Sequence, residues 1–209
     1  MPRRSETVPL RKHCRRATTM QQLVPQEECG LAHDAYCIQC ETGQEARVVS
    51  LLTTNYPELT ILCARQEKHQ SRQGVKRLVQ VNMLPGYVFL YATGDVPVRS
   101  ILSHHSIFRF LSYGTAGDYA LRDGDRDFAD WIYRNDGLLS CSQAVQVGTE
   151  VRIVSGPLRD SLGTIEKVDR HNRNICLSIP FDGIRRLVWM PFEWTDSKNP
   201  ISFSPTTPT

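Results

Sequence analysis

The chain has 209 residues, of which 40% are hydrophobic, and a formal net charge of +3. This size allows one or two packed domains, and the charge is too small to indicate a nucleic acid partner by itself. The sequence has neither the roughly 18 consecutive apolar residues of a membrane-spanning helix nor the apolar core of a secretory signal, so we expect a cytoplasmic protein with no membrane partner.

The first 33 residues carry charges without a sustained hydrophobic period, which predicts a disordered extension over residues 1–33. Among the first twenty residues of this extension Glu6 is the only acidic one. The basic residues there are Arg3, Arg4, Arg11, Lys12, Arg15 and Arg16. At the other end we expect residues 197–209 to form a flexible tail.

Strand and helix patterns alternate after the extension. Residues 35–40 predict a strand, and Thr42 and Glu45 have the spacing of a capping box for a helix that runs to about Asn55. Residues 59–64 and 78–81 favour two further strands, with a polar loop over 66–74 between them. Residues 86–91, GYVFLY, predict a central strand because they are apolar and aromatic after the glycine.

Two helices and one strand are expected next. Asp95 is placed to cap a helix that runs to about His104, and residues 107–111 favour another strand. Phe128, Trp131 and Ile132 have helical spacing, which predicts a third helix over 122–135, and the glycine at 137 offers its stop. Residues 136–146 have no strong period and are predicted to form a linker between domains.

Residues 147–196 predict a small curled antiparallel sheet, because short apolar runs alternate there with glycine and polar residues. The apolar runs 151–154 and 187–190 flank a Gly156-Pro157 turn, a second glycine at Gly163 and a polar tip at 171–174. Basic and acidic residues balance in this part, so any nucleic acid contact within it must be local.

The seven cysteines are an odd number without the dense spacing of a disulfide scaffold. Cys37 and Cys40 form a CxxC, but residues three apart in a strand point to opposite faces of the sheet. Since no second pair completes a zinc ligand set, we expect no metal and no cofactor. No Cys/His catalytic signature is present either, and we expect a protein that is not an enzyme.

Residues 151–163 resemble the KOW motif, with Val154, Gly156, Pro157 and Gly163 at the matching positions. Upstream, residues 35–52 and the segment LPGYVFLY at 84–91 resemble the NGN domain of the NusG family of transcription elongation factors. The resemblance covers roughly residues 35–195. It implies an α+β fold, in which an NGN domain over 34–135, an antiparallel sheet flanked by helices, is linked to an all-β, SH3-like KOW barrel over 147–196.

The resemblance also implies a function. Members of this family bind the clamp region of RNA polymerase through the NGN domain and reduce pausing, while the KOW domain recruits another partner. Rigid aromatic residues in an apolar patch suit such a contact. The predicted polymerase-binding residues are Tyr36, Leu84, Pro85, Gly86, Tyr87 and Phe89. The alternative is that these side chains only fill the core, because aromatic residues in strands usually do.

The polar loop offers a second candidate surface. It lies where the family approaches nucleic acid, including the non-template DNA strand, or the polymerase itself. Its candidate residues, taken over the longer stretch 66–77, are Lys68, His69, Arg72, Lys76 and Arg77. A solvated loop without a partner is the alternative.

The sequence departs from general family members by its extension, its tail and its 180–186 segment, which indicates a specialised paralogue most like LoaP. LoaP-like proteins promote processive antitermination at selected operons, and their KOW domain binds a nascent RNA hairpin. The predicted RNA-binding residues are Arg159, Lys167, Arg170, His171, Arg173, Arg185 and Arg186. Phe181 occupies the approximate position at which general family members contact a ribosomal protein.

Two other functions remain open from the sequence. One is a general NusG-type elongation factor that couples the polymerase to a ribosomal protein or a termination factor. The other is a ribosome-associated KOW protein that binds RNA, which does not require the LPGYVFLY segment. In each case we expect a monomer.

Overall fold

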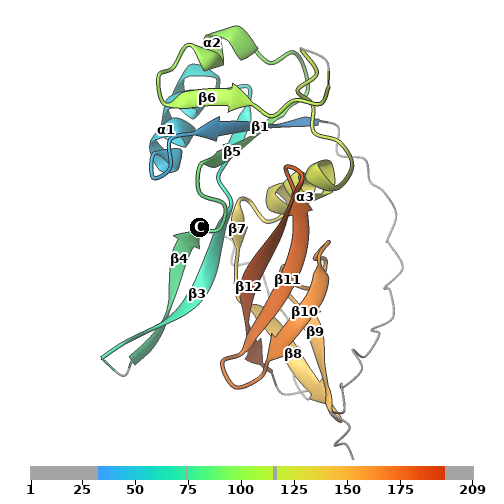
Figure 1. Cartoon of the computed structure of the whole chain (residues 1–209). Helices are drawn as coiled ribbons and strands as arrows, with labels where there is room; N and C mark the ends of the chain where they lie inside the picture. The colour runs from blue at the N-terminus through green and yellow to red at the C-terminus, as the bar shows by residue number, and fades with distance from the viewer. Residues whose placement is uncertain (1–32, 74, 115–116, 196–209) are drawn as a thin grey trace, which may run out of the picture. The chain divides into compact units, whose positions relative to one another are not determined.

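The computed structural model describes residues 33–73, 75–114 and 117–195, which belong to one compact unit (Figure 1). The predicted extension, apart from His33, and the predicted tail lie outside the described residues. No helix in the described part of the chain is both long and apolar enough to cross a membrane.

A four-stranded sheet forms the centre of the N-terminal part, with strand order β2-β5-β1-β6. Its strands are β1 (Asp34–Cys40), β2 (Thr60–Leu62), β5 (Tyr87–Ala92) and β6 (Ile107–Phe110). The segment predicted as a central strand is β5, which pairs antiparallel with both β1 and β2. Every residue of β5 is buried, because both faces of the sheet are covered.

The two faces of this sheet support two separate cores. Val88 and Leu90 pack on the side of α1 (Glu45–Asn55) and α2 (Val98–Leu102), whereas Tyr87 and Phe89 pack on the side of α3 (Asp123–Arg134). Cys37 and Cys40 also divide between the two cores, as the strand periodicity predicts. The helix α3 buries the predicted stripe of Phe128, Trp131 and Ile132 and ends at Arg134, three residues before the predicted stop at Gly137, whose φ is +74°.

Three local predictions are wrong. Residues 66–74 are not a loop: β3 (Arg65–Arg72) pairs with β4 (Val75–Asn82) along its whole length, and this long hairpin satisfies its own backbone groups. At the start of α1 the N-cap is Gln44, with no side-chain cap, and Glu45 is the first helical residue. Helix α2 begins after Pro97 rather than at Asp95, since proline fits the start of a helix.

The C-terminal part is a five-stranded sheet with strand order β10-β11-β12-β8-β9. Its strands are β8 (Ser142–Val147), β9 (Glu150–Ser155), β10 (Thr164–Asp169), β11 (Asn174–Phe181) and β12 (Ile184–Trp194). The predicted linker over 136–146 therefore contains β7 (Leu138–Leu139), which pairs with β3, and most of β8. We call residues 34–139 the sheet domain and residues 142–194 the barrel.

The two glycines of the KOW resemblance lie where the barrel backbone packs closely. A Cβ on Gly156 would lie 2.7 Å from the Ser142 hydroxyl oxygen, and one on Gly163 would lie 2.9 Å from a side-chain carbon of Ile179. Only glycine fits at these two distances. The sequence signature therefore reports close contacts between neighbouring strands.

Candidate functional site

The predicted polymerase-binding strand is covered by the barrel in this structure. Phe181, at the end of β11, is fully buried, and its ring centroid lies 5.6 Å from that of Tyr87 and 5.5 Å from that of Phe89. The ring of Phe128 on α3 also contacts Phe181, with 4.9 Å between the two ring centroids. Figure 1 shows the end of β11 beside α3. These four rings form the aromatic interface between the sheet domain and the barrel.

Polar groups hold the turn between β11 and β12 against the same surface. The Tyr87 hydroxyl donates to the Asp182 carboxylate at 3.0 Å, and the Asp182 backbone N–H donates to the Asp125 carboxylate at 2.9 Å. The Arg186 guanidinium carbon lies over the Tyr87 ring, 5.2 Å from its centroid, in a cation–π contact. The Arg109 guanidinium forms an ion pair with the Asp182 carboxylate, with 3.6 Å between nitrogen and oxygen. We call these five residues the Tyr87–Asp182 network.

The network depends on a tight turn. Asp182 and Gly183 have φ values of +53° and +66°, which is the two-residue hairpin geometry that Asp-Gly favours. Burial raises the pKa of Tyr87, and its hydrogen bond to Asp182 raises that pKa further. Tyr87 therefore keeps its proton and remains a donor across the neutral range.

Leu84 and Pro85 lie next to this interface. Leu84 is buried, Pro85 is exposed, and Gly86 has a φ of +83°. Together with the turn they border a cleft of about 340 Å³. Its lining residues come from both domains: Met83, Leu84, Pro85, Phe128, Ile179, Phe181, Ile184, Arg185, Arg186, Leu187 and Val188.

Tyr36 is separated from the other predicted polymerase-binding residues. It is half-buried and packs with the core on the α1 and α2 side of the sheet, opposite Tyr87 and Phe89. Its register partner on β5 is Leu90. The structure therefore brings together Leu84, Tyr87 and Phe89 but not Tyr36.

The predicted RNA-binding residues occupy two ends of the barrel. Arg170, His171 and Arg173 are exposed around the turn that precedes β11, while Arg185 and Arg186 follow the turn after β11. The strand β11 runs between these two turns, so the structure does not bring the two groups of basic residues together. We call Arg170, His171 and Arg173 the distal tip.

The arginines differ in their engagement. Arg185 contacts the Glu166 carboxylate and the Ser178 hydroxyl, and Arg186 belongs to the Tyr87–Asp182 network. Arg159 is exposed after the Gly-Pro turn, and Lys167 is exposed on β10. The Pro157 carbonyl in that turn accepts a hydrogen bond from the Trp131 indole at 3.1 Å, which places Arg159 near α3.

Comparison with known proteins follows the same two-part division. Residues 34–126 match the family model described as "Transcription termination factor nusG", and residues 147–176 match the KOW motif. The chain is thus similar to NusG proteins over its sheet domain and carries a KOW motif in its barrel. It is 26% identical over 176 residues to the "Transcription termination/antitermination protein NusG" of Pasteurella multocida (strain Pm70), covering 78% of this chain and 94% of that protein.

Two solved structures show similarity to this chain. One is described as "Domain interaction in Thermotoga maritima NusG", with 20% identity, a TM-score of 0.46, and coverage of 76% of this chain and 93% of that one. The other is the "MjSpt4:Spt5 complex conformation B", with 11% identity, a TM-score of 0.25, and coverage of 75% and 91%. The predicted NusG-like fold, a sheet with helices followed by an all-β domain, is confirmed.

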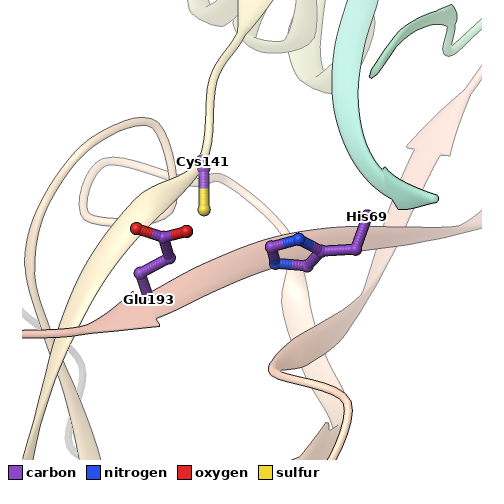
Figure 2. A group of neighbouring side chains, drawn as sticks. All are labelled: His69, Cys141 and Glu193. Carbon is purple, nitrogen blue, oxygen red and sulfur yellow. The ribbon is translucent and has the colours of Figure 1, made fainter. Parts of the chain in front are cut away.

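The basic residues predicted in a loop lie on the β3–β4 hairpin. Lys68 and Arg77 are exposed, and Arg72 and Lys76 lie near its turn, opposite Val75 and Ser71. His69 differs, because it is half-buried and points toward Cys141 and Glu193 (Figure 2). The hairpin therefore presents exposed basic groups from strands rather than from a loop.

The described cysteines of the chain are free thiols. Burial raises the pKa of Cys40 to about 11, and burial together with Glu193 and Glu67 raises the pKa of Cys141 to about 12. Thiols with such pKa values are protonated and weakly nucleophilic at neutral pH.

Sequence reasoning missed Asp125, Arg109 and Asp182 as parts of the site. None of them belongs to a recognisable motif, and their contacts depend on the docking of the two domains. The Asp-Gly pair after Phe181 was the available signal, since it predicts a tight turn that presents its flanking side chains.

Proposed function

We propose that this chain is a NusG-family transcription factor that binds RNA polymerase through Leu84, Tyr87 and Phe89, and that it reduces pausing so that transcription continues through terminators at selected operons. The observation that carries the proposal is the pair of aromatic side chains on β5, Tyr87 and Phe89, that packs against Phe181 of a second domain beside the helix α3 of its own domain. Rigid aromatic side chains are typical anchors of protein–protein contacts.

In this proposal the barrel and the polymerase compete for one surface. Phe181 fills the aromatic interface, so the polymerase reaches Phe89 only when the barrel moves away. The interface is also held by exposed or half-exposed polar contacts such as Arg109 with Asp182, which exchange readily with water. An interface of this mixed character suits reversible docking.

A released barrel supplies the second activity. The distal tip and Lys167 place cationic groups at one end of the barrel, where they reach phosphates and the acceptors of guanine. We propose that this end recognises a nascent RNA hairpin. The exposed Lys68 and Arg77 on the hairpin support a further contact with non-template DNA.

The burial of Phe181 makes the ribosomal contact of a general factor depend on the same release of the barrel. A residue that is fully buried in the aromatic interface cannot contact a ribosomal protein while the domains are docked. Mapping the native protein across the genome separates the general from the specialised role: occupancy at a few loci supports a specialised factor, and occupancy of most transcribed genes supports the general one.

Single-round transcription tests the main proposal. A template with a candidate leader and an intrinsic terminator is transcribed by RNA polymerase of the same source, with the full chain added. We expect fewer pauses and more read-through, and loss of both with Tyr87→Ala. Tyr56→Ala is the matched control, because Tyr56 is a half-buried tyrosine on the other side of the sheet. Absence of polymerase binding and of any change in read-through contradicts the proposal.

A further inference from the structure

Three side chains with metal-binding chemistry meet where the two domains join. His69 comes from β3 of the sheet domain, Cys141 from the segment between β7 and β8, and Glu193 from β12 of the barrel. Their ligand atoms all lie within 4.8 Å of one another. Figure 2 shows the Glu193 carboxylate and the His69 ring on either side of the Cys141 sulfur.

The imidazole of His69 carries an unsatisfied atom. Its Nε2 is buried, and no other group in the described part of the chain forms a hydrogen bond with it. A buried nitrogen without a partner is uncommon in folded proteins, and an unobserved ion is one of the ordinary reasons for it. The nitrogen belongs to a side chain that points toward a thiol and a carboxylate, which are the other two preferred types of zinc ligand.

The surroundings of the cluster favour a cation. Glu67, two residues before His69 on β3, accepts a hydrogen bond from the Cys141 backbone N–H at 2.7 Å. This bond fixes the backbone of Cys141 and adds a second carboxylate near the sulfur, in addition to Glu193. Groups that orient a ligand residue in this way are common around metal centres.

We propose that His69, Cys141 and Glu193 bind a Zn²⁺ ion, with water as the fourth ligand. Zinc bonds of about 2.0–2.3 Å in a tetrahedron require ligand atoms about 3.3–3.8 Å apart, so the cluster must contract by roughly 1 Å. Glu193 is exposed and its side chain is able to make this shift. The hard and soft ligand set of nitrogen, sulfur and oxygen fits zinc better than magnesium or calcium.

The location gives the ion a structural consequence. Its three ligands come from the hairpin of the sheet domain, the joining segment and the last strand of the barrel. One ion at this point cross-links all three and holds the domains in the docked arrangement. Zinc binding is thus expected to stabilise the docked chain, as any ligand specific to a folded state does.

Metal titration of the full chain tests the site directly. The protein is stripped with a chelator under reducing conditions and titrated with Co²⁺, followed by displacement with Zn²⁺. We expect one equivalent of Co²⁺ to produce tetrahedral absorption with a thiolate charge-transfer band. Cys141→Ser should abolish that band, and His69→Gln and Glu193→Gln should each weaken binding at least tenfold.

Matched controls separate this cluster from the other thiols and imidazoles. Cys63→Ser changes another half-buried cysteine, and His105→Gln changes an exposed histidine, and both variants should bind like the unmodified chain. A charge-transfer band that persists in Cys141→Ser, or the absence of stoichiometric binding, overturns the proposal. If Cys141→Ser is not folded by circular dichroism, Glu193→Gln decides, because that exposed side chain contributes little to packing. These measurements need neither polymerase nor RNA and are independent of the proposed transcriptional function.

Discussion

The hydroxyl of Tyr87 on β5 donates a hydrogen bond to the carboxylate of Asp182 in the β11–β12 turn, with 3.0 Å between the two oxygens. The residues are far apart in the sequence and belong to different domains. This single bond therefore reports whether the barrel is docked on the sheet domain. It also links the segment that most resembles the NusG family to the segment of the barrel that departs from the family pattern.

Replacement of Tyr87 by phenylalanine removes this bond and keeps the ring. A hydrogen bond to a charged group contributes about 1.5–3 kcal/mol when well buried, and Asp182 is partly exposed, so we expect a loss of about 1 kcal/mol in the free energy of unfolding. Urea denaturation measures it. Tyr56→Phe is the control, since its hydroxyl bonds to Ser100 at an exposed position. Equal losses in the two variants contradict a special role for the interdomain bond.

Phe181→Ala tests the aromatic interface. Truncation of a buried phenylalanine costs about 3–5 kcal/mol, and here the loss falls on the contact between the domains. We expect a lower unfolding midpoint for the chain together with tighter binding to RNA polymerase, because Tyr87 and Phe89 become accessible. Ile184→Ala, at a neighbouring residue that is 55% exposed, should change neither quantity appreciably. Weaker polymerase binding by a folded Phe181→Ala protein argues against competition for one surface.

Glu45 predicts a pH dependence of stability. Burial tends to raise the pKa of this carboxyl, but the backbone N–H groups of Gly86 and Gly43, at 2.6 and 2.9 Å, outweigh it and hold the pKa below the usual 4.5. A lowered pKa in the folded state contributes stability above the usual value, and this contribution is lost as the pH falls through the folded-state value. Glu45→Gln should therefore cost about 1–2 kcal/mol at pH 7 and less below pH 4.

Unfolding curves recorded between pH 3 and pH 7 measure the difference. The wild type should lose more stability across this range than Glu45→Gln. Glu58→Gln, which changes an exposed glutamate after the same helix, should follow the wild type. Parallel pH profiles for the wild type and Glu45→Gln exclude the carboxylate as the cause.

Two glycines of the barrel give a matched pair of backbone tests. Gly148 has a φ of +59° with open space around it, so Gly148→Ala should cost only the strain of that conformation, about 1 kcal/mol. Gly156 has a φ of +90°, and its new Cβ also meets the Cα of Ser142 at 2.8 Å, so Gly156→Ala should cost about 3 kcal/mol. Thermal unfolding of both variants measures the contrast, which disappears if the strand contact at Ser142 is loose in solution.

The distal tip predicts the salt dependence of RNA binding. Arg173→Ala and Lys167→Ala each remove an exposed cation, and each should lower the slope of log affinity against log salt by about 1 if it contacts a phosphate. Arg185→Ala should leave the slope unchanged, because Arg185 is paired with Glu166. Binding of a candidate leader hairpin at several salt concentrations provides the slopes. If Arg185→Ala lowers the slope more than Arg173→Ala and Lys167→Ala do, the RNA site lies at the other end of the barrel.

The sequence predicted the elements whose own residues specify them. The apolar strand β5, the amphipathic helix α3 and the close-packed glycines of the barrel each carry a local signal. Strand β3 was missed because its residues are polar and its order comes from pairing with β4, of which only residues 78–81 were predicted. The burial of Phe181 was missed because it depends on a surface in another domain. The meeting of His69, Cys141 and Glu193 depends on the same docking and has no spacing that a motif search detects.

The join between the domains sets the terms of any competition with the polymerase. Only Ser140 and Cys141 separate β7, which pairs with β3, from β8, which pairs with β9 and β12. A tether this short gives a detached barrel an effective concentration on the order of millimolar near the surface it has left. The polymerase must therefore compete with the tethered barrel at each encounter. The fraction of the protein bound to polymerase then depends on how long the barrel stays undocked. Nascent RNA bound at the distal tip would lengthen that time.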